Sequence, residues 1–309
     1  MSQQPDSERD TTRDGGDDDG IVTVADALRE ATKELRAASV EEPRREAATL
    51  LAATIARDRA FLVAHSDDAL APDALKLFRA RVSRRASGEP TQYITGRQEF
   101  YGLDFEVSPA VLIPRPETEL LVETALELLR GVGEPRLCDV GTGSGCVAVA
   151  LLHERADARA VAVDISEDAL RVAARNAARH SVSDRLALVA SDCFDALDPA
   201  AHRFDLVASN PPYVAEGDLD TLQREVREHE PRLALTPGGD GLSVVRRLLE
   251  ESPRFLRGGG CLVFEIGYDQ HEAVRQLIDA RVWTLLEIYE DLQGIPRTVA
   301  LRLSHRALK

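Results

Sequence analysis

From about residue 119 onward, apolar runs typical of strands alternate with the spacing of amphipathic helices, and we assign residues 119–309 to one domain. Strands are predicted at 136–140, 159–164, 185–190, 204–210, 260–266, 282–289 and 297–303, and helices near 117–130, 145–154, 167–180, 241–251 and 269–280. This alternation favours an α/β fold, with a mostly parallel sheet covered by helices on both faces. Only residues 291–295 separate the last two strands, which predicts an antiparallel pair there.

Three segments precede this alternating region. Residues 1–20 are acidic and almost without aliphatic side chains, so we expect a disordered tail. Residues 21–87 predict a small helical bundle whose first helix is capped by Thr23, with Asp26 three positions later. Residues 88–118 combine aromatic and β-branched residues with glycines and prolines, and are expected to form a linking β-hairpin followed by a Pro-rich loop.

Composition limits the partners and the location of the chain. The chain has 53 acidic and 38 basic residues, and its net charge of −15 disfavours a dedicated binder of nucleic acid or of an anionic membrane. No apolar run approaches the roughly 20 residues that span a bilayer, and no apolar leader is visible, so we expect a cytoplasmic protein. The four cysteines form no Cys-x-x-Cys pair, so neither a metal site nor a disulfide framework is expected.

A glycine-rich loop follows the first predicted strand of the sheet. Gly141, Gly143 and Gly145 alternate with Thr142 and Ser144, and an apolar helix follows. Such a loop leaves main-chain N–H groups free at a helix N-terminus and lets a ligand approach the backbone. Its Gly-x-Gly-x-Gly spacing is one residue short of the dinucleotide pattern. Asp139, just before the loop, is better placed for an ammonium group than for a pyrophosphate.

Acidic residues also end the next two predicted strands. Asp164 ends the second strand, where a carboxylate can accept both hydroxyls of a ribose. Asp192 follows the third strand and could accept from an adenine amine, while the N–H of Cys193 could donate to the ring. Acids at strand ends also serve as helix caps, and Asp164 alone does not separate NAD from S-adenosylmethionine.

The tetrapeptide Asn210-Pro211-Pro212-Tyr213 follows the fourth strand. Two consecutive prolines cannot continue a strand, so the turn is stiff, and it lies at the sheet edge where α/β proteins bind ligands. An Asn side-chain oxygen and a nearby carbonyl can accept both hydrogens of a planar NH2 group, with Tyr213 available to stack on its face. An ordinary Pro-rich loop is the alternative.

The Pro-rich loop before the sheet carries two opposite charges. Arg115 and Glu117 are separated by Pro116, which limits their backbone freedom. They form either a structural ion pair or part of a site.

These motifs together resemble a known family. The chain looks like a class I S-adenosylmethionine-dependent methyltransferase, and more closely like the PrmC/HemK family of protein-(glutamine-N5) methyltransferases. The segments that carry the likeness are Pro90–Gly96, Ile113–Glu119, Asp139–Gly145, Val163–Asp164, Ser191–Asp192, Asn210–Tyr213, Glu230–Leu235 and Phe264–Gly267. The resemblance implies a Rossmann-like methyltransferase domain with a seven-stranded, mostly parallel sheet and an antiparallel last strand. It also implies that residues 21–87 recognise a substrate protein.

The resemblance also implies roles for particular residues. Those expected to bind S-adenosylmethionine are Gly141, Thr142, Gly143, Ser144, Gly145, Asp164, Asp192, Cys193 and Asn210. Those expected to bind the glutamine of a Gly-Gly-Gln loop in peptide-chain release factors are Asn210, Pro211, Pro212 and Tyr213, with Asn210, Pro211 and Tyr213 as catalytic residues. Cys193 departs from the family, which often has a large aromatic there; either Phe194 compensates or the adenine packs differently. No cationic side chain is expected near the sulfonium.

Other functions stay open at this point. The acceptor could be a glutamine of a ribosomal protein, or an exocyclic amine of a nucleic-acid base, although the acidic charge disfavours the latter. A non-catalytic cofactor-binding protein would not need Asn210 and Tyr213, and an NAD oxidoreductase is disfavoured by the glycine spacing. We expect a monomer with a protein substrate, no direct nucleic-acid substrate and no membrane partner.

Overall fold

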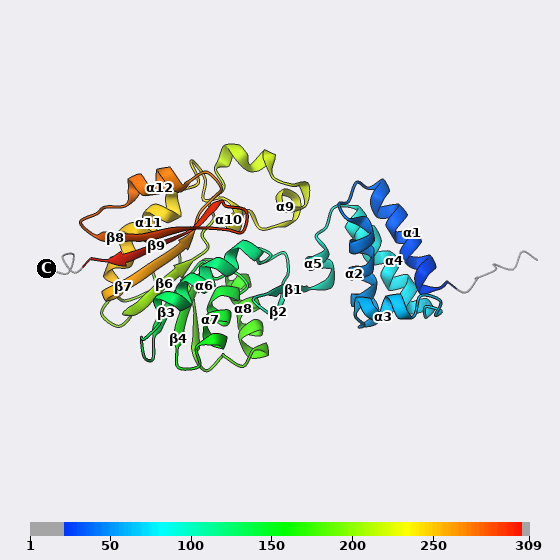
Figure 1. The fold of residues 1–309 in the computed structure, drawn as a ribbon, viewed down its shortest axis with the longest axis horizontal. Coiled ribbons are helices and arrows are strands. Elements are labelled where there is room, and N and C mark those ends of the chain that lie inside the picture. Colours follow the sequence, from blue (N-terminus) through cyan, green and yellow to red (C-terminus); the bar gives the residue numbers. More distant parts are fainter. Residues whose placement is uncertain (1–21, 305–309) are drawn as a thin grey trace, which may run out of the picture. The chain divides into compact units, whose positions relative to one another are not determined.

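The computed structural model in Figure 1 describes residues 22–304. The acidic tail predicted at residues 1–20 lies outside the described residues. The chain divides into two compact units, one up to Ser83 and one from Arg84 onward, and each is described by itself.

The first unit is helical. It contains α1 (Val24–Ala37), α2 (Pro43–Ile55), α3 (Arg59–Ala64) and most of α4 (Pro72–Ala86). The expected cap of α1 is present, because the Thr23 side chain accepts from the Asp26 N–H and the Asp26 carboxylate accepts from the Thr23 N–H. The buried face of α1 packs against α2 and consists of Val24, Ala27, Ala31 and Leu35.

A short hairpin opens the second unit. Strands β1 (Arg97–Phe100) and β2 (Leu103–Glu106) pair antiparallel, which confirms the predicted hairpin. Tyr101 and Gly102 both have positive φ, as a two-residue hairpin turn requires. The preceding residues form a helix that was not predicted, α5 (Thr91–Thr95), which ends at a left-handed Gly96. The β-branched and aromatic residues that favour a strand there instead form the buried side of this helix.

The rest of the second unit has the predicted alternation of strands and helices. After the hairpin its elements are η1 (Pro116–Thr118), α6 (Glu119–Leu128), β3 (Arg136–Val140), α7 (Cys146–Glu154), β4 (Arg159–Asp164), α8 (Glu167–Arg179), β5 (Leu186–Ala190), β6 (Phe204–Ser209), η2 (Glu216–Thr221), α9 (Arg224–His229), α10 (Arg232–Leu235), α11 (Ser243–Glu251), η3 (Ser252–Arg254), β7 (Leu256–Glu265), α12 (His271–Leu277), β8 (Trp283–Glu290) and β9 (Pro296–Leu303). The elements from η2 to α10 were not predicted.

These strands form one sheet in the order β5-β4-β3-β6-β7-β9-β8. The pairs from β5 to β7 are parallel, and β9 runs antiparallel to both β7 and β8. The mostly parallel seven-stranded sheet with an antiparallel last strand is therefore confirmed, with β9 inserted between β7 and β8. The strand order reverses at β3, which places β4 on one side and β6 on the other.

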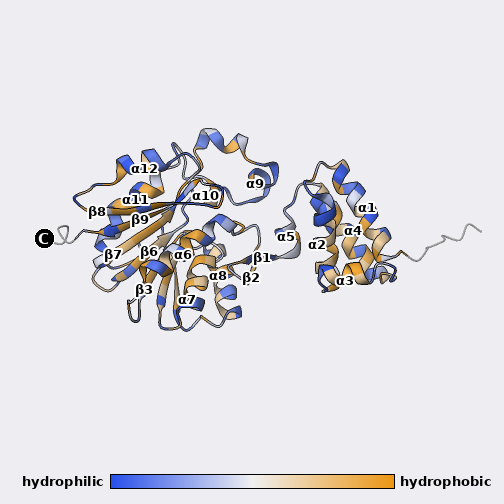
Figure 2. Cartoon of the chain, viewed as in Figure 1, coloured by the Kyte–Doolittle hydropathy of each residue, from blue (hydrophilic) through white to orange (hydrophobic). Residues whose placement is uncertain are grey.

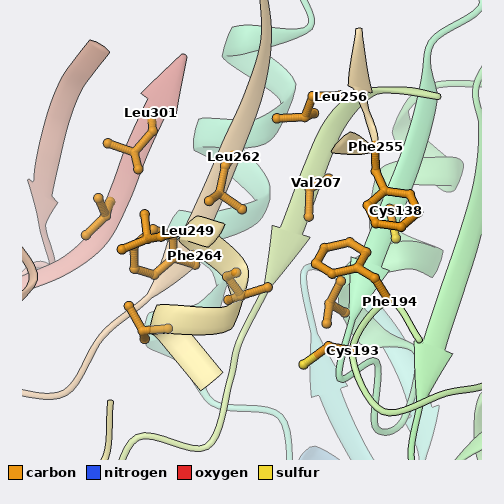
Figure 3. Packing of buried hydrophobic residues seen from close by; sticks show 14 of the residues in the cluster. Cys138, Cys193, Phe194, Val207, Leu249, Phe255, Leu256, Leu262, Phe264 and Leu301 are labelled. Carbon is orange, nitrogen blue, oxygen red and sulfur yellow. The ribbon is translucent and has the colours of Figure 1, made fainter. Parts of the chain in front are cut away.

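Helices cover both faces of the sheet (Figure 1). Helices α6, α7 and α8 share one apolar cluster with Leu206 and Ala208 of β6, and α11 and α12 share the other with Val207. This alternation is the period of two that a strand imposes. Because both faces are covered, the central strands are largely apolar (Figure 2). Figure 3 shows the α11 side, where Phe194 stacks on Phe255 with ring centroids 4.7 Å apart.

Across residues 22–304, no helix is both long enough and apolar enough to cross a membrane.

Candidate active site

A cavity of about 430 Å³ lies at the carboxyl ends of β3, β4 and β6, where the strand order reverses. Its wall includes most of the predicted site residues: Gly141, Thr142, Gly143, Ser144, Asp164, Asp192, Cys193, Asn210, Pro211 and Pro212. Two predicted site residues, Gly145 and Tyr213, do not line it. Asp192 and Cys193 follow β5, so the fold gathers the ends of four strands, β3, β4, β5 and β6, into one hollow.

The glycine loop turns the chain sharply from β3 into α7. Gly141, Gly143 and Gly145 all have positive φ, between 54° and 82°. The N–H groups of Gly141 and Thr142 both donate to the Val163 carbonyl at the end of β4, which ties the loop to the neighbouring strand. An added Cβ at Gly145 would lie 3.1 Å from the Cβ of Ala173, so this glycine lets α7 pack closely on α8.

Asp139 is a buried carboxylate under the loop, with 2% of its surface exposed. Its Oδ2 accepts from the Thr142 hydroxyl at 2.6 Å and from the Ala148 N–H at 3.2 Å. Burial raises the pKa of Asp139 to about 6, although these two hydrogen bonds oppose the shift. Its Oδ1 has no partner among the described residues, and the residue lines the cavity, so this oxygen is available to a ligand cation.

Asp164 both organises the loop and lines the cavity. Its Oδ2 accepts from the Gly143 N–H at 2.8 Å, and its Oδ1 accepts from the Ser166 N–H at 2.9 Å. Burial raises the pKa of Asp164, and these main-chain N–H groups lower it. The helix-cap alternative does not hold for Asp164, because Ser166 caps α8. Each carboxylate oxygen of Asp164 keeps a lone pair for a ligand hydroxyl.

The far end of the cavity carries a cation that the sequence did not predict. Arg247, from α11, donates to Asp192 Oδ1 at 2.7 Å and also pairs with Asp195 and Glu251. Among the described residues that line the cavity it is the sole cation. Its charge is held by three carboxylates, and the Asp192 Oδ2 atom has no partner in the described part of the chain.

Cys193 lines the cavity, whereas Phe194 does not. Cys193 has a positive φ of 48°, and burial raises the pKa of its thiol to about 12, so the sulfur is a neutral, compact wall atom. Phe194 points into the core and stacks on Phe255 (Figure 3), so it does not compensate for the missing aromatic. Ile165 and Val244 are the apolar neighbours that line this region instead.

The Asn-Pro-Pro-Tyr turn is held by a chain of hydrogen bonds that runs from Asn210 and Thr118 in the cavity wall to Glu265 and Tyr213, which do not line the cavity. The Asn210 amide donates through Nδ2 to the Thr118 hydroxyl at 2.9 Å, and that hydroxyl donates to Glu265 Oε2 at 2.7 Å. The Tyr213 hydroxyl donates to the other oxygen of Glu265 at 3.2 Å. One buried carboxylate therefore fixes both ends of the tetrapeptide.

The backbone of the turn is supported as well. The Gln270 amide donates to the Tyr213 carbonyl at 2.8 Å. Gly241 has a φ of +78°, and an added Cβ there would lie only 2.3 Å from the same carbonyl, so this position requires glycine. Tyr213 itself faces Glu265 rather than the cavity, so its predicted stacking on a substrate amide has no counterpart in this arrangement.

Arg115 and Glu117 do not form a pair with each other. Arg115 forms an ion pair with Glu230, which is 6% exposed and whose Oε2 also accepts from the Ile113 N–H at 3.1 Å. This contact joins the Pro-rich loop to the segment before α10. Both segments line the cavity, through Leu112 and Pro114 on one side and Pro231 on the other, next to Leu233 and Ala234 of α10.

Sequence reasoning thus missed several residues that shape the site: Thr118, Glu230, Arg247, Glu265 and Gln270. Three of them, Thr118, Glu230 and Glu265, stood in segments singled out for family likeness, but no chemistry was assigned to them there. A charged residue inside the apolar run that forms β7 is the signal that could have found Glu265, because a buried carboxylate needs partners.

The strand order, the glycine loop and the acid at the end of β4 define a class I methyltransferase. Residues 116–258 match the family model described as the methyltransferase small domain, and residues 26–96 match the PrmC N-terminal domain.

Relatives match nearly the whole chain. A release factor glutamine methyltransferase of Koribacter versatilis is 42% identical over 281 residues, which is 91% of this chain and 99% of that protein. One of Cereibacter sphaeroides is 45% identical over 284 residues, with the same shares covered. A solved protein-(glutamine-N5) methyltransferase (release factor-specific) of Alicyclobacillus acidocaldarius is 29% identical, covers 65% of this chain and 99% of its own, and has a TM-score of 0.40. The chain belongs to the release factor glutamine methyltransferase family, as the resemblance predicted.

Proposed function

We propose that this enzyme transfers a methyl group from S-adenosylmethionine to the side-chain amide nitrogen of the glutamine in the Gly-Gly-Gln loop of peptide-chain release factors. The observation that carries the proposal is the unused acceptor pair at the Asn-Pro-Pro-Tyr turn. Asn210 Nδ2 is occupied by Thr118, whereas Asn210 Oδ1 and the Pro211 carbonyl accept no hydrogen bond from any described residue. Both residues line the cavity.

The residues around the cavity fit S-adenosylmethionine. A volume of about 430 Å³ is in the range of small-molecule sites. The free Oδ1 of Asp139 suits an ammonium group, and Asp164 suits ribose hydroxyls. An added Cβ at Gly143 would meet no atom within 4 Å, so the loop backbone faces open space that a ligand can approach. Asp192 and the Cys193 N–H, which has no protein partner among the described residues, would hold the adenine.

When bound, the cofactor supplies a methyl group on a positively charged sulfur, so its departure needs no acid. The amide nitrogen of glutamine is a weak nucleophile because its lone pair is delocalised. Asn210 Oδ1 and the Pro211 carbonyl oxygen would each accept a hydrogen bond from one N–H group of the glutamine amide. They orient the nitrogen and stabilise the positive charge that develops on it. Pro211 and Pro212 keep these oxygens in place because they stiffen the turn.

Tyr213 acts in this proposal from behind the site. Burial, together with the charge of Glu265, raises the pKa of its hydroxyl, so it stays protonated and donates to Glu265. It thereby braces the turn on which Asn210 lies. No general base is assigned, because the amide product can release its extra proton to water after transfer.

The partner follows from family membership and is also part of the proposal. The relatives are named for release factors, and we propose the same substrate, a cytoplasmic location and a monomeric enzyme. We further propose that residues 21–87 recognise the body of the release factor and that residues 88–118 link this part to the catalytic domain of residues 119–309. Turnover compared on a whole factor and on a Gly-Gly-Gln peptide, with and without residues 21–87, tests that role.

Mass spectrometry of release factors after incubation with enzyme and cofactor tests the function. We expect one added methyl group, located on the Gly-Gly-Gln glutamine. A ribosomal-protein fraction, RNA and DNA are run in parallel with labelled cofactor. Methyl transfer to one of these, with none to release factors, would refute the proposed substrate.

A further inference from the structure

Glu265 is a buried carboxylate at the end of β7 to which the chemistry above assigns no proton transfer. Only 1% of its surface is exposed. Its two oxygens accept from two different hydroxyls, those of Thr118 and Tyr213. The Thr118 hydroxyl contacts Asn210, and Tyr213 belongs to the same turn, so the charge state of Glu265 can act on that turn.

The hydrogen-bond directions follow from chemistry. An ionised carboxylate only accepts, so the single hydrogen of the Thr118 hydroxyl is committed to Glu265. The Thr118 oxygen can then only accept from Asn210, 2.9 Å away, and the Asn210 amide must turn its NH2 group inward. The other end of a planar amide is its oxygen, which is therefore turned away from Thr118 and is left without a protein partner.

We propose that Glu265 is a positioning residue that, through Thr118, fixes the orientation of the Asn210 amide and so presents Oδ1 to the substrate glutamine. This inference rests on the proposed function. Glu265 touches neither substrate nor cofactor in it, and acts only by setting which end of the Asn210 amide faces the acceptor.

A protonated Glu265 would lose this control. Its acid hydrogen can donate to the Thr118 oxygen, which frees the Thr118 hydrogen to donate to Asn210. The Asn210 amide is then stable with its oxygen inward and its NH2 group toward the acceptor. Two NH2 groups would face each other, and neither can accept a hydrogen bond.

Protonation of Glu265 is expected near neutral pH. Burial raises its pKa to about 7, and Glu117 adds to the increase, whereas the hydrogen bonds of Thr118 and Tyr213 and the charge of Arg297 oppose it. The nearby Cys146 thiol on α7 does not titrate in this pH range, because burial raises its pKa to about 12. We therefore expect turnover to be high above this pH and to fall as the pH decreases through it.

The test measures kcat at saturating cofactor and substrate from about pH 5 to about pH 9. In Thr118→Val, which removes the relay but keeps the shape, kcat should fall by about tenfold to a hundredfold and lose its step near neutral pH. Thr118→Ser should restore both. In Glu265→Gln the step should disappear, because the titrating group is gone. Cofactor affinity by calorimetry should stay unchanged in all three variants.

A matched control lies on the next strand. Thr298 of β9 is the direct cross-strand partner of Glu265, is fully buried, and its hydroxyl has no hydrogen-bond partner in the described region. Thr298→Val is the same substitution as Thr118→Val at the same depth. It should leave both kcat and the pH profile unchanged.

Thermal unfolding tests the protonation of Glu265 independently of turnover. The folded chain holds the Glu265 proton more tightly than the unfolded chain does, so its contribution to stability falls as the pH rises from 4.5 to about 7. Glu265→Gln removes that loss, and its Tm relative to the parent should increase over this range. A purely structural role of Glu265 predicts that the folded fraction of Glu265→Gln keeps the pH step of the parent enzyme.

Two outcomes overturn the inference: full kcat in Thr118→Val, or an unchanged pH step in Glu265→Gln. Either result, with an active parent enzyme, leaves the proposed function intact. A parent enzyme that methylates no glutamine refutes the proposed function itself.

Discussion

The two ends of the cavity are built in different ways. At the cofactor end, the contacts are largely between a carboxylate and main-chain N–H groups close by in the fold, as at Asp164 with Gly143 and Ser166. At the acceptor end, two side chains from two distant segments, Thr118 and Glu265, hold Asn210 and Tyr213.

Because of this difference, we expect the two ends to tolerate different substitutions. Main-chain donors are present whatever the side chain, so the cofactor end depends on backbone conformation and on a few acids. The acceptor end depends on the protonation state and length of particular buried side chains, since a single lost partner leaves a buried polar group unsatisfied. We expect substitutions at the cofactor end to change affinity and those at the acceptor end to change turnover.

The largest effect is expected at the acceptor end. Asn210→Ala removes one of the two acceptors for the amide N–H bonds, and kcat should fall by about 10²–10³-fold. Cofactor affinity, measured by calorimetry, should decrease much less. Equal loss of affinity and turnover would contradict the separation of the two ends, and undiminished turnover on a release factor would remove Asn210 from the mechanism.

A smaller effect is expected at the cofactor end. Asp164→Asn removes the charge and one acceptor, and cofactor affinity should fall by about tenfold to a hundredfold, with kcat at saturation retained. Asp198 is a matched control, because its Oδ1 also accepts from the N–H two residues later, at 2.8 Å, but it does not line the cavity. Asp198→Asn should leave cofactor affinity unchanged.

The smallest effect concerns the backbone of the glycine loop. Gly145→Ala and Gly131→Ala both place a side chain at a φ near +80°, but only the alanine at 145 would press on Ala173. We expect Gly145→Ala to lower the free energy of unfolding by about 1–3 kcal/mol more than Gly131→Ala, as overpacking does. Equal destabilisation in thermal or denaturant unfolding would show that α8 moves aside at little cost.

Much of the fold was predictable because it depends on local pattern. The alternation of apolar runs and helical spacing predicted the seven strands, and the short link between 282–289 and 297–303 predicted their antiparallel pairing. The short helix α5 was not predicted, because Tyr93 and Ile94 favour strands by propensity but are buried here on a helix.

The site was predictable at its cofactor end and less so behind the acceptor. The glycine loop, Asp164 and Asn210 are recognisable within short segments, and all three line the cavity. The directions of the Tyr213 and Phe194 side chains were not predictable, since each could face a ligand or the core. Packing decided this, with Phe194 against Phe255 and Tyr213 against Glu265.

The sequence by itself determined the sheet, the glycine turn and the stiff prolyl corner, because each follows from the conformational limits of neighbouring residues. Only the tertiary structure decided which side chains hold Asn210. Thr118 and Glu265 are 147 residues apart in the chain, and their hydrogen bond exists because η1 passes the carboxyl end of β7. A contact between residues so distant depends on how the elements pack, and no local pattern in the sequence encodes it.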